Sequence, residues 1–410
     1  MVQFARGNNL PRVKLSNQSS ILRMIYHCGP IKRAEISKRL GLTLPTITTN
    51  VNDMIAEGIV RETDCQNADL SSPGRRARPV EIVPESRHFV GVEIQEYRRT
   101  VCVLNFRGET IVQRMDELHL TDYAQSMERT CAVVQQALAE AGLRLDQVNG
   151  ICLCLPGLVN SGSGILDTCP RFGWSNKNIV ADAAALIGYR GPIMAENNAC
   201  ARAYGAQLFH HEKLDGAKTF AYLLVSCGIA CPLVLNTPDQ LAFVVGAGEV
   251  GHMIMEPNGR LCSCGNQGCL EAYSSKRAVI DRCTQAIHAG GAPVLRKLCP
   301  ADRQPGMREI LAAQEAADPD VCRIIEEALY YLGLAVININ HFACPPVMMI
   351  DGDLFCREEN RAYLLETDRR NRRNPSHAAT RFVFLEPDAF SGARGAAARA
   401  IFKNMEAHVD

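Results

Sequence analysis

The 410-residue chain has no excess of either charge, since 44 Lys and Arg residues balance 44 Asp and Glu residues. This balance excludes a strongly basic or acidic protein, and any surface that binds nucleic acid must come from a local group of basic side chains. No uninterrupted apolar run is long enough to span a membrane, so we expect no membrane insertion. The first residues, MVQFARGNN, have the pattern of neither a secretory nor an anchoring segment. We therefore expect a cytoplasmic protein of two or three domains.

The eighteen cysteines lack the setting of a disulfide-rich secreted domain. They are scattered through apolar, strand-like segments of a long chain in which no secretory signal is evident. We expect most of them to be reduced and buried, where cysteine behaves as a small apolar residue.

Four potential metal ligands, one imidazole and three thiols, are concentrated in the run EVGHMIMEPNGRLCSCGNQGCLE at 249–271. They are His252, Cys262, Cys264 and Cys269. The glycines between them allow the tight turns that a tetrahedral Zn²⁺ site needs. A closed set of four ligands leaves no position for a reacting water, so the metal would be structural. The alternative is three buried cysteines beside a histidine of the core.

Two carboxylates, those of Glu249 and Glu271, flank the predicted metal ligands. Carboxylates are strong acceptors for sugar hydroxyls, and a metal-folded loop would hold them in place. The pattern E-x-G-H followed by C-x-C-G-x-x-G-C-L-E resembles the signature of the ROK family of repressors and sugar kinases. In that family the histidine binds zinc through one ring nitrogen and faces the sugar with the other, and both glutamates contact the sugar. The resemblance implies sugar-binding roles for Glu249, His252 and Glu271.

Residues 1–70 have the pattern of a winged helix-turn-helix domain. Apolar residues at helical spacing predict helices over 16–27, 32–40 and 43–57, with Gly41 in the turn before the third. The third helix has a predicted buried stripe made of Leu44, Ile47, Val51, Met54 and Ile55. Its other face carries small polar side chains that suit phosphates and base edges. These candidate DNA contacts are Thr46, Thr48, Thr49 and Asn52.

Residues 71–86 are predicted to be the wing and a linker. Strand-like segments at 58–61 and 80–83 flank the basic turn PGRRARP. Its arginines, placed for phosphate or a narrow minor groove, are Arg75, Arg76 and Arg78. The segment resembles the N-terminal domain of ROK repressors, which free-standing ROK kinases lack. A helical protein-interaction module with a basic linker is the alternative, and the acidic Asp53 and Glu57 favour it.

After Pro84, short strands alternate with helices, which indicates an α/β body. Strands are predicted at 89–94, 100–105, 109–115, 150–155, 192–195, 220–225, 231–235, 241–245 and 347–350, and helices at 123–140 and 199–207. The ROK resemblance implies that two such halves form the two-lobed actin-like ATPase/hexokinase fold. We assign 87–195 to lobe 1 and 196–410 to lobe 2, which would hold the zinc loop, the sugar cleft and the dimerisation surface.

Asn197 and Asn198 follow a predicted strand and begin a helix, a position at which polar residues line clefts. Asparagine also caps helices, and the two roles are compatible. By resemblance, the pair corresponds to the N-D pair of ROK kinases and contacts sugar hydroxyls. The aspartate of that pair is the general base of the kinases, and the amide of Asn198 cannot accept a proton. The sequence therefore predicts no catalytic residue.

The phosphate-binding loops of the family are also altered. The first, D-x-G-G-T, corresponds to 93–97, where both glycines are replaced and Glu96 adds a repelling charge. The second, G-T-G-I-G-G-G, corresponds to 226–232, where only Gly228 and Ile229 remain. The sequence DGD at 351–353 stands where the family has G-G. We expect no ATP binding.

Together these features predict a sugar-responsive transcriptional regulator, a repressor of carbohydrate uptake or catabolism genes. A homodimer or tetramer would place two winged helices on an inverted-repeat operator in double-stranded DNA. A sugar or sugar phosphate in the cleft would shift the protein between DNA-competent and incompetent states. Two alternatives stay open, which are a sugar kinase with a fused DNA-binding domain and a regulator whose effector is a protein.

Overall fold

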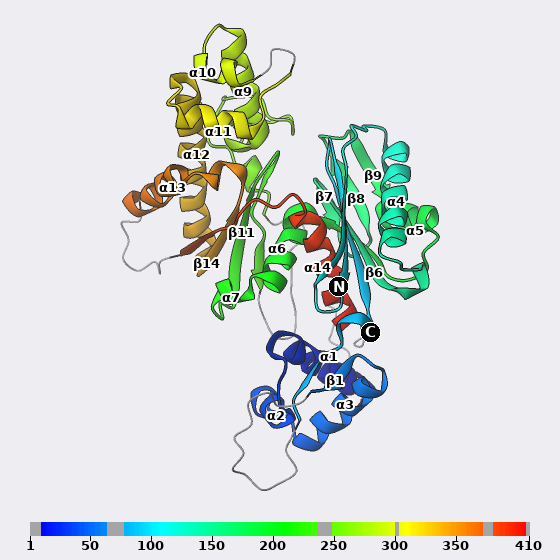
Figure 1. Ribbon diagram of the computed structural model, residues 1–410. Coiled ribbons are helices and arrows are strands. Elements are labelled where there is room, and N and C mark those ends of the chain that lie inside the picture. Colours follow the sequence, from blue (N-terminus) through cyan, green and yellow to red (C-terminus); the bar gives the residue numbers. More distant parts are fainter. Residues whose placement is uncertain (1–9, 64–77, 236–247, 300–302, 372–379, 407–410) are drawn as a thin grey trace, which may run out of the picture.

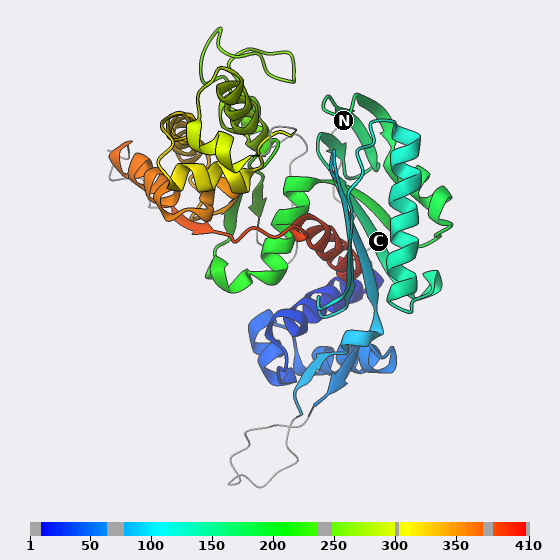
Figure 2. The same cartoon turned by 45° about the horizontal axis from the view of Figure 1, so that its top comes forward.

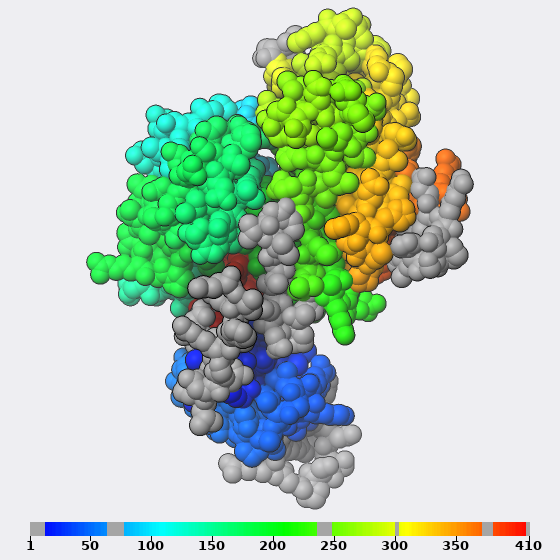
Figure 3. Space-filling view, turned by 180° about the vertical axis from the view of Figure 1, so that it is seen from behind, coloured from blue at the N-terminus to red at the C-terminus, as the bar shows by residue number. Residues whose placement is uncertain are grey.

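The computed structural model describes residues 10–63, 78–235, 248–299, 303–371 and 380–406. An N-terminal domain lies beneath two α/β lobes (Figures 1 and 2). The space-filling view from behind shows this domain as a distinct body below the lobes (Figure 3). Among the helices of these ranges, none is both long and apolar enough to cross a membrane. The cysteines of the same ranges are all free thiols, as predicted.

The N-terminal domain consists of three helices and a two-stranded hairpin. Its elements are α1 (Leu10–Cys28), α2 (Arg33–Leu40), α3 (Leu44–Ala56), β1 (Val60–Glu62) and β2 (Val80–Ile82). The two strands are antiparallel, which confirms the predicted wing strands. Helix α3 begins where predicted because the Thr43 side chain accepts a hydrogen bond from the backbone N–H of Thr46 and proline stands in the first turn.

The predicted buried stripe of α3 is wrong at one position. Leu44 is 48% exposed, whereas Asn50 is 4% exposed and donates from Nδ2 to the Thr46 carbonyl at 2.7 Å. Side chains of a helix lean towards its N-terminus, so the first residue of α3 points past the end of the core.

Lobe 1 is built on a five-stranded sheet in the order β10-β6-β3-β4-β5. The strands are β3 (His88–Ile94), β4 (Arg99–Asn105), β5 (Thr110–Asp116), β6 (Val148–Leu155) and β10 (Ile193–Asn197). Helices α4 (Tyr123–Glu140) and α5 (Ile179–Ile187) cover its outer face (Figure 2). A small sheet that the sequence did not predict contains β7 (Leu158–Asn160), β8 (Ile165–Cys169) and β9 (Trp174–Asn178).

Lobe 2 has a second sheet in the order β12-β11-β14-β15, with β13 also paired to β11. The strands are β11 (Thr219–Val225), β12 (Ile229–Ala230), β13 (Leu233–Leu235), β14 (Val347–Asp351) and β15 (Arg381–Phe384). Its helices are α8 (Glu271–Ser274), α9 (Lys276–His288), α10 (Pro293–Leu298), α11 (Met307–Glu315), α12 (Pro319–Ala343) and α13 (Glu358–Asn371).

The strand predicted at 231–235 is confined to β13 at 233–235, and the separate short strand β12 precedes it. The Cys231 N–H donates to the Gly248 carbonyl rather than to β11, and Pro232 has no N–H to donate. The ladder with β11 is therefore broken between β12 and β13. The strand predicted at 241–245 lies outside the described residues.

Helices α6 (Asn198–Phe209) and α14 (Ser391–Glu406) lie between the two lobes (Figure 1), and the short α7 (His211–Leu214) follows α6. The structure differs here from the division into lobes at residue 196, because α14 packs on β3 and β6 of lobe 1. The contact is close, since a Cβ on Gly91 would lie 1.9 Å from the Ala393 carbonyl oxygen. The last helix, α14, therefore belongs with lobe 1 rather than with lobe 2.

Candidate functional site

A cleft of about 470 Å³ lies between the lobes, and all five residues predicted to bind sugar line it. They are Asn197, Asn198, Glu249, His252 and Glu271. They come from the junction of β10 with α6, from the run that follows residue 248, and from the start of α8. Residues far apart in the sequence are thus brought to one cavity, with carboxylate, amide and imidazole groups that suit a polyhydroxyl ligand.

Asn197 is held at the junction of β10 and α6. Its Oδ1 accepts from the Ala199 N–H at 2.8 Å, and its Nδ2 donates to the Gly157 carbonyl at 2.9 Å. The neighbouring Glu196 is buried and accepts from the Asn197 N–H and from the Ser161 hydroxyl. Burial raises the pKa of Glu196. Asn197 therefore caps α6, the alternative role considered for it, and also lines the cleft.

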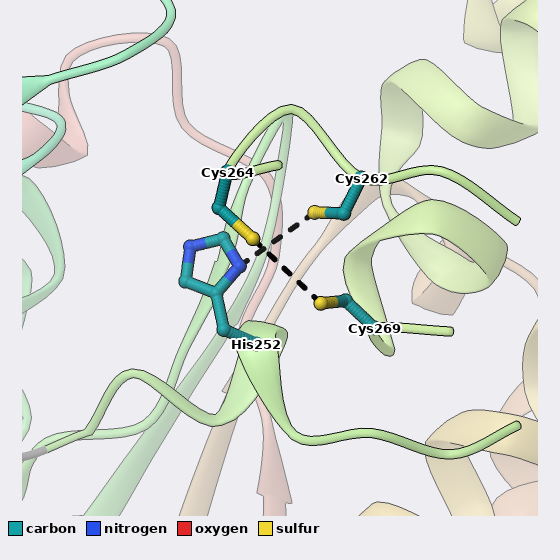
Figure 4. A group of neighbouring side chains, drawn as sticks. All are labelled: His252, Cys262, Cys264 and Cys269. Carbon is teal, nitrogen blue, oxygen red and sulfur yellow. Dashed lines mark hydrogen bonds between the residues drawn. The ribbon is translucent and has the colours of Figure 1, made fainter. Parts of the chain in front are cut away.

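The four predicted metal ligands point towards one another (Figure 4). Their ligand atoms lie within 4.8 Å of one another. His252 Nδ1 is 3.7 Å from Cys262 Sγ, and Cys264 Sγ is 3.8 Å from Cys269 Sγ. Ligands bound tetrahedrally at about 2.3 Å from Zn²⁺ would lie roughly 3.8 Å apart, so the cluster fits such an ion. The four side chains therefore form a cluster that could hold a metal ion.

The loop at 252–269, which carries the four side chains, is held by its own turns and by α12. A Cβ on Gly268, whose φ is +80°, would lie 1.8 Å from the Glu256 carbonyl oxygen, so only glycine fits there. The Arg260 guanidinium stacks on the Tyr273 ring at 4.4 Å and pairs with Glu327 of α12 at 2.8 Å. Burial raises the pKa of the Cys269 thiol to about 12, and thiolate is the form that binds a metal.

The imidazole of His252 belongs both to the Cys and His cluster and to the lining of the cleft. While Nδ1 faces the thiols, Nε2 lies 3.8 Å from Glu249 Oε2. Burial raises the pKa of Glu249, His252 lowers it, and Glu271 raises it again. The two carboxylates therefore share one part of the cleft, beside the ring nitrogen that does not face the thiols.

Glu271 accepts hydrogen bonds from lobe 2 and has an ion-pair contact with lobe 1. Its Oε2 accepts from the Ile229 N–H at 3.3 Å, and its Oε1 accepts from the Ser263 hydroxyl at 3.2 Å. Arg171, in the turn between β8 and β9 of lobe 1, places Nη2 4.0 Å from Glu271 Oε1 and donates to the Cys227 carbonyl at 2.5 Å. The contact between Arg171 and Glu271 was not predicted, because a basic residue in an irregular turn gives no local signal of a partner across the cleft.

The segments at 93–97 and 226–232, which by resemblance correspond to the phosphate loops of the family, contribute residues to the lining of the same cleft. Glu96 and Tyr97 line it, the Tyr97 ring stacks on His119 with centroids 4.6 Å apart, and Glu96 Oε2 lies 3.4 Å from Arg277 Nη1. In the segment at 93–97, the side chains of Glu96 and Tyr97 therefore project into the cleft, and Glu96 pairs with Arg277 of α9.

A buried ion pair joins the lobes through α6. Glu93 of β3 is fully buried and accepts from Arg202 Nη2 at 2.8 and 3.2 Å. Arg202 also donates to the Ser391 hydroxyl at 2.6 Å, and its Nε lies 3.8 Å from Asp351 Oδ2 at the end of β14. Gly392 makes room for Glu93, since a Cβ there would lie 2.2 Å from the carboxyl carbon.

The candidate DNA contacts on α3 differ in exposure. Thr49 and Asn52 are exposed, whereas Thr46 and Thr48 are half-buried. The Thr48 hydroxyl donates to the Leu44 carbonyl at 2.9 Å, and Asn52 Oδ1 accepts from Arg33 Nη2 at 3.3 Å.

Of the charged residues considered near the wing, the structure places Arg78 and Asp53. Arg78 is exposed, and Arg75 and Arg76 lie outside the described residues. Asp53, which favoured a protein-interaction module, pairs with Lys14 at 2.8 Å. Its charge is therefore offset within the domain.

The arrangement defines a two-lobed body with a cleft between the lobes, joined to a domain of three helices and a two-stranded hairpin. The ROK family model matches residues 89–403, and the chain belongs to the ROK family. A model described as winged helix-turn-helix DNA-binding matches residues 16–61.

Known proteins match either most of this chain or about three quarters of it. The xylose repressor of Bacillus subtilis (strain 168) is 25% identical over 338 residues, which cover 82% of each chain. A solved ROK family transcriptional regulator, a homologue of the E. coli Mlc protein, has a TM-score of 0.78 at 23% identity and covers 97% of this chain and 98% of its own. A ROK glucokinase from Streptomyces griseus, solved with glucose and AMPPNP, has a TM-score of 0.64 at 21% identity and covers 76% of this chain and 98% of its own. The predicted fold class is confirmed.

Proposed function

We propose that the protein is a sugar-responsive DNA-binding transcriptional regulator that represses genes of carbohydrate uptake or catabolism. The observation that carries this proposal is that five side chains able to hydrogen-bond sugar hydroxyls line one cleft, in a chain that also matches a winged helix-turn-helix domain. The name of the relative from Bacillus subtilis, a xylose repressor, supports it. Its ligand is a sugar or sugar phosphate, bound by Asn197, Asn198, Glu249, His252 and Glu271.

The metal of the Cys and His cluster is proposed to be a structural Zn²⁺. Its ligands would be His252, Cys262, Cys264 and Cys269, whose separations suit that ion. A structural metal supplies folding free energy to a loop that has little core of its own. In this role the metal would fix the orientation of the His252 ring. The ring in turn would fix the position of the nitrogen that faces Glu249.

The protein is proposed not to be a kinase. An amide stands at Asn198, where the kinases of the family have the general base, and Glu96 replaces a phosphate-binding glycine. Incubation with labelled ATP and a panel of hexoses and N-acylated hexosamines tests this point. We expect no sugar phosphate and no ATP binding, and turnover of any sugar would instead support the alternative of a kinase with a fused DNA-binding domain.

Operator recognition is proposed to use a homodimer, or a tetramer built from dimers, with one winged helix on each half-site of an inverted repeat. Contacts would come from Thr46, Thr48, Thr49 and Asn52 of α3 and from Arg75, Arg76 and Arg78 of the wing. A regulator with this architecture acts on DNA in the cytoplasm. A protein effector is the second candidate, favoured if no sugar binds.

Replacing Asn52 with glutamate is expected to weaken operator binding by about tenfold or more. The exposed side chain lies on the face of α3 that would approach DNA, and a carboxylate there would repel phosphates. Gln135→Glu, which adds the same charge on exposed α4 of lobe 1, is the matched control. Equal affinities of the two variants at one salt concentration would contradict the assignment of α3 to DNA.

Arg171→Met is expected to weaken sugar binding by about tenfold, because the half-buried ion-pair contact that helps to position Glu271 is lost. Arg171→Lys keeps the charge without the fork geometry and should restore part of the affinity. Titration calorimetry measures both variants, with exposed Arg190→Met as the control. Unchanged affinity in Arg171→Met would remove Arg171 from the proposed site.

A further inference from the structure

The N-terminal domain meets the body at the end of α1, where Tyr26 and His27 contact three separate segments. Arg107 of the β4–β5 turn donates from Nη1 to the Tyr26 carbonyl at 2.9 Å. The His27 ring lies 5.7 Å from the His211 ring of α7 and stacks at 6.5 Å on Phe402 of α14, measured between centroids. A displacement of any of these segments therefore reaches α1 directly.

Helix α6 ends at the same place. A Cβ built on Gly108 would lie 3.1 Å from both the Phe209 ring and the Tyr26 hydroxyl, and 3.5 Å from the Leu208 side chain. Two residues at the end of α6 and one at the end of α1 thus surround the tip of the β4–β5 turn. We call these four residues, Tyr26, Gly108, Leu208 and Phe209, the control junction.

The other end of α6 lies in the cleft, where Asn197 caps it and Asn198 begins it. Along most of its length α6 is buried, and its backbone touches α14, since a Cβ on Gly205 would lie 3.0 Å from the Cα of Gly395. Arg202 ties the middle of the helix to Glu93. A helix of 12 residues held in this way moves as a rigid body, so a shift at the cleft is carried to the control junction.

The Tyr26 hydroxyl is buried, and within the described residues it has no hydrogen-bond partner. A buried hydroxyl left unpaired costs free energy comparable to a lost hydrogen bond. Burial raises the pKa of Tyr26, so the hydroxyl keeps its proton at neutral pH. Glu109 directly follows Gly108, the residue that packs against the Tyr26 hydroxyl. Its Oε2 accepts from Asn105 Nδ2 at 2.7 Å, and a carboxylate has further acceptor positions that Tyr26 could reach if α1 moves. At this hydroxyl, the observed packing is therefore less favourable than a packing in which the hydroxyl donates a hydrogen bond.

We propose that the control junction couples the cleft to the DNA-binding domain. Ligand in the cleft displaces α6, and α1 exchanges the observed packing for a second one in which the Tyr26 hydroxyl is hydrogen-bonded. The proposal rests on the proposed function in one respect, namely that the cleft binds a ligand. Two packings of this kind give the ligand and the operator a common equilibrium to bias, as coupling between distant sites requires.

Tyr26→Phe in the full-length protein tests the proposal, because it removes the unpaired hydroxyl and keeps the ring. The equilibrium constant between the two packings should shift about fivefold or more towards the observed one. Either operator DNA or sugar, whichever favours the second packing, should therefore bind more weakly by about that factor. Fluorescence anisotropy measures the DNA affinity, and titration calorimetry with the sugars of the panel measures the sugar affinity.

Tyr189→Phe is the matched control. Its hydroxyl is buried in lobe 1 and donates to the Val148 carbonyl at 2.9 Å, so its loss should lower the melting temperature and leave both affinities unchanged. Tyr26→Phe should melt no lower than the wild type, since no hydrogen bond of the observed packing is lost.

Operator and sugar affinities of Tyr26→Phe that both stay within about twofold of the wild type overturn the proposal. Failure of the proposed function has a different signature, which is wild-type DNA binding that no sugar changes. In that case DNA affinity alone decides the matter, and a change in Tyr26→Phe but not in Tyr189→Phe still supports coupling through the control junction.

Discussion

A Cys262→Ser variant is expected to lose its response to sugar while it still binds operator DNA. The substitution leaves three of the four ligands, and a structural zinc site that loses one ligand loses much of the free energy that folds its loop. Glu249, His252 and Glu271 belong to the same run, so their positions in the cleft depend on that fold. We expect sugar affinity to fall by at least about tenfold, and treatment with a chelator to have the same effect on the wild-type protein.

Cys322→Ser is the matched control, because Cys322 is half-buried on α12 and takes no part in the cluster. It should retain both sugar and DNA binding. Metal content measured on the purified proteins should be one ion per chain in this control and less in Cys262→Ser. Parallel loss of sugar and DNA binding in Cys262→Ser would show instead that the metal supports the whole body.

Arg202→Met is expected to destabilise the body by about 3–5 kcal/mol, the cost of leaving a buried charge unpaired. Glu93 is fully buried and accepts two hydrogen bonds from the Arg202 guanidinium, so it would lose its compensating charge. The double variant Glu93→Gln with Arg202→Met should be less destabilised than the sum of the two single changes. Denaturant unfolding of the four proteins gives this coupling directly.

The exposed pair of Arg144 and Asp146 provides the control for that experiment. Both side chains are mostly in solvent, and Arg144→Met should produce no measurable change in the unfolding midpoint. Equal midpoints for Arg202→Met and Arg144→Met would contradict the view that the buried pair holds the lobes together.

Local sequence spacing was enough to predict the Cys and His cluster and the three helices of the N-terminal domain, although α1 begins six residues before the predicted start at 16. The ligands His252 to Cys269 lie within 18 residues of sequence, and the glycines between them set the turns, so tertiary packing had little to add. The wing strands also followed from short apolar segments around a basic turn. The roles of the cleft residues came from the family resemblance, because nothing in the spacing alone brings Asn197 beside Glu249.

The remaining features depend on contacts between distant residues, which periodicity does not encode. Glu93 and Arg202 are 109 residues apart, and the residues next to each of them in the sequence do not indicate an ion pair. Arg171 reaches its partners across the cleft from an irregular turn. The return of α14 to lobe 1 rests on backbone contact at glycines, and the apolar pattern of a helix does not say which sheet it will cover.

The most direct test of the proposed function is the anisotropy of a fluorescent DNA fragment from the upstream region of the gene. The purified protein is titrated onto this DNA with each sugar of a panel, at one fixed salt concentration because phosphate contacts make affinity depend strongly on ionic strength. We expect specific binding that one sugar or sugar phosphate changes severalfold and that Asn52→Glu abolishes or weakens. Specific binding that no sugar changes would contradict the sugar-responsive role, and absence of specific binding would contradict the assignment of the winged helix to operator DNA.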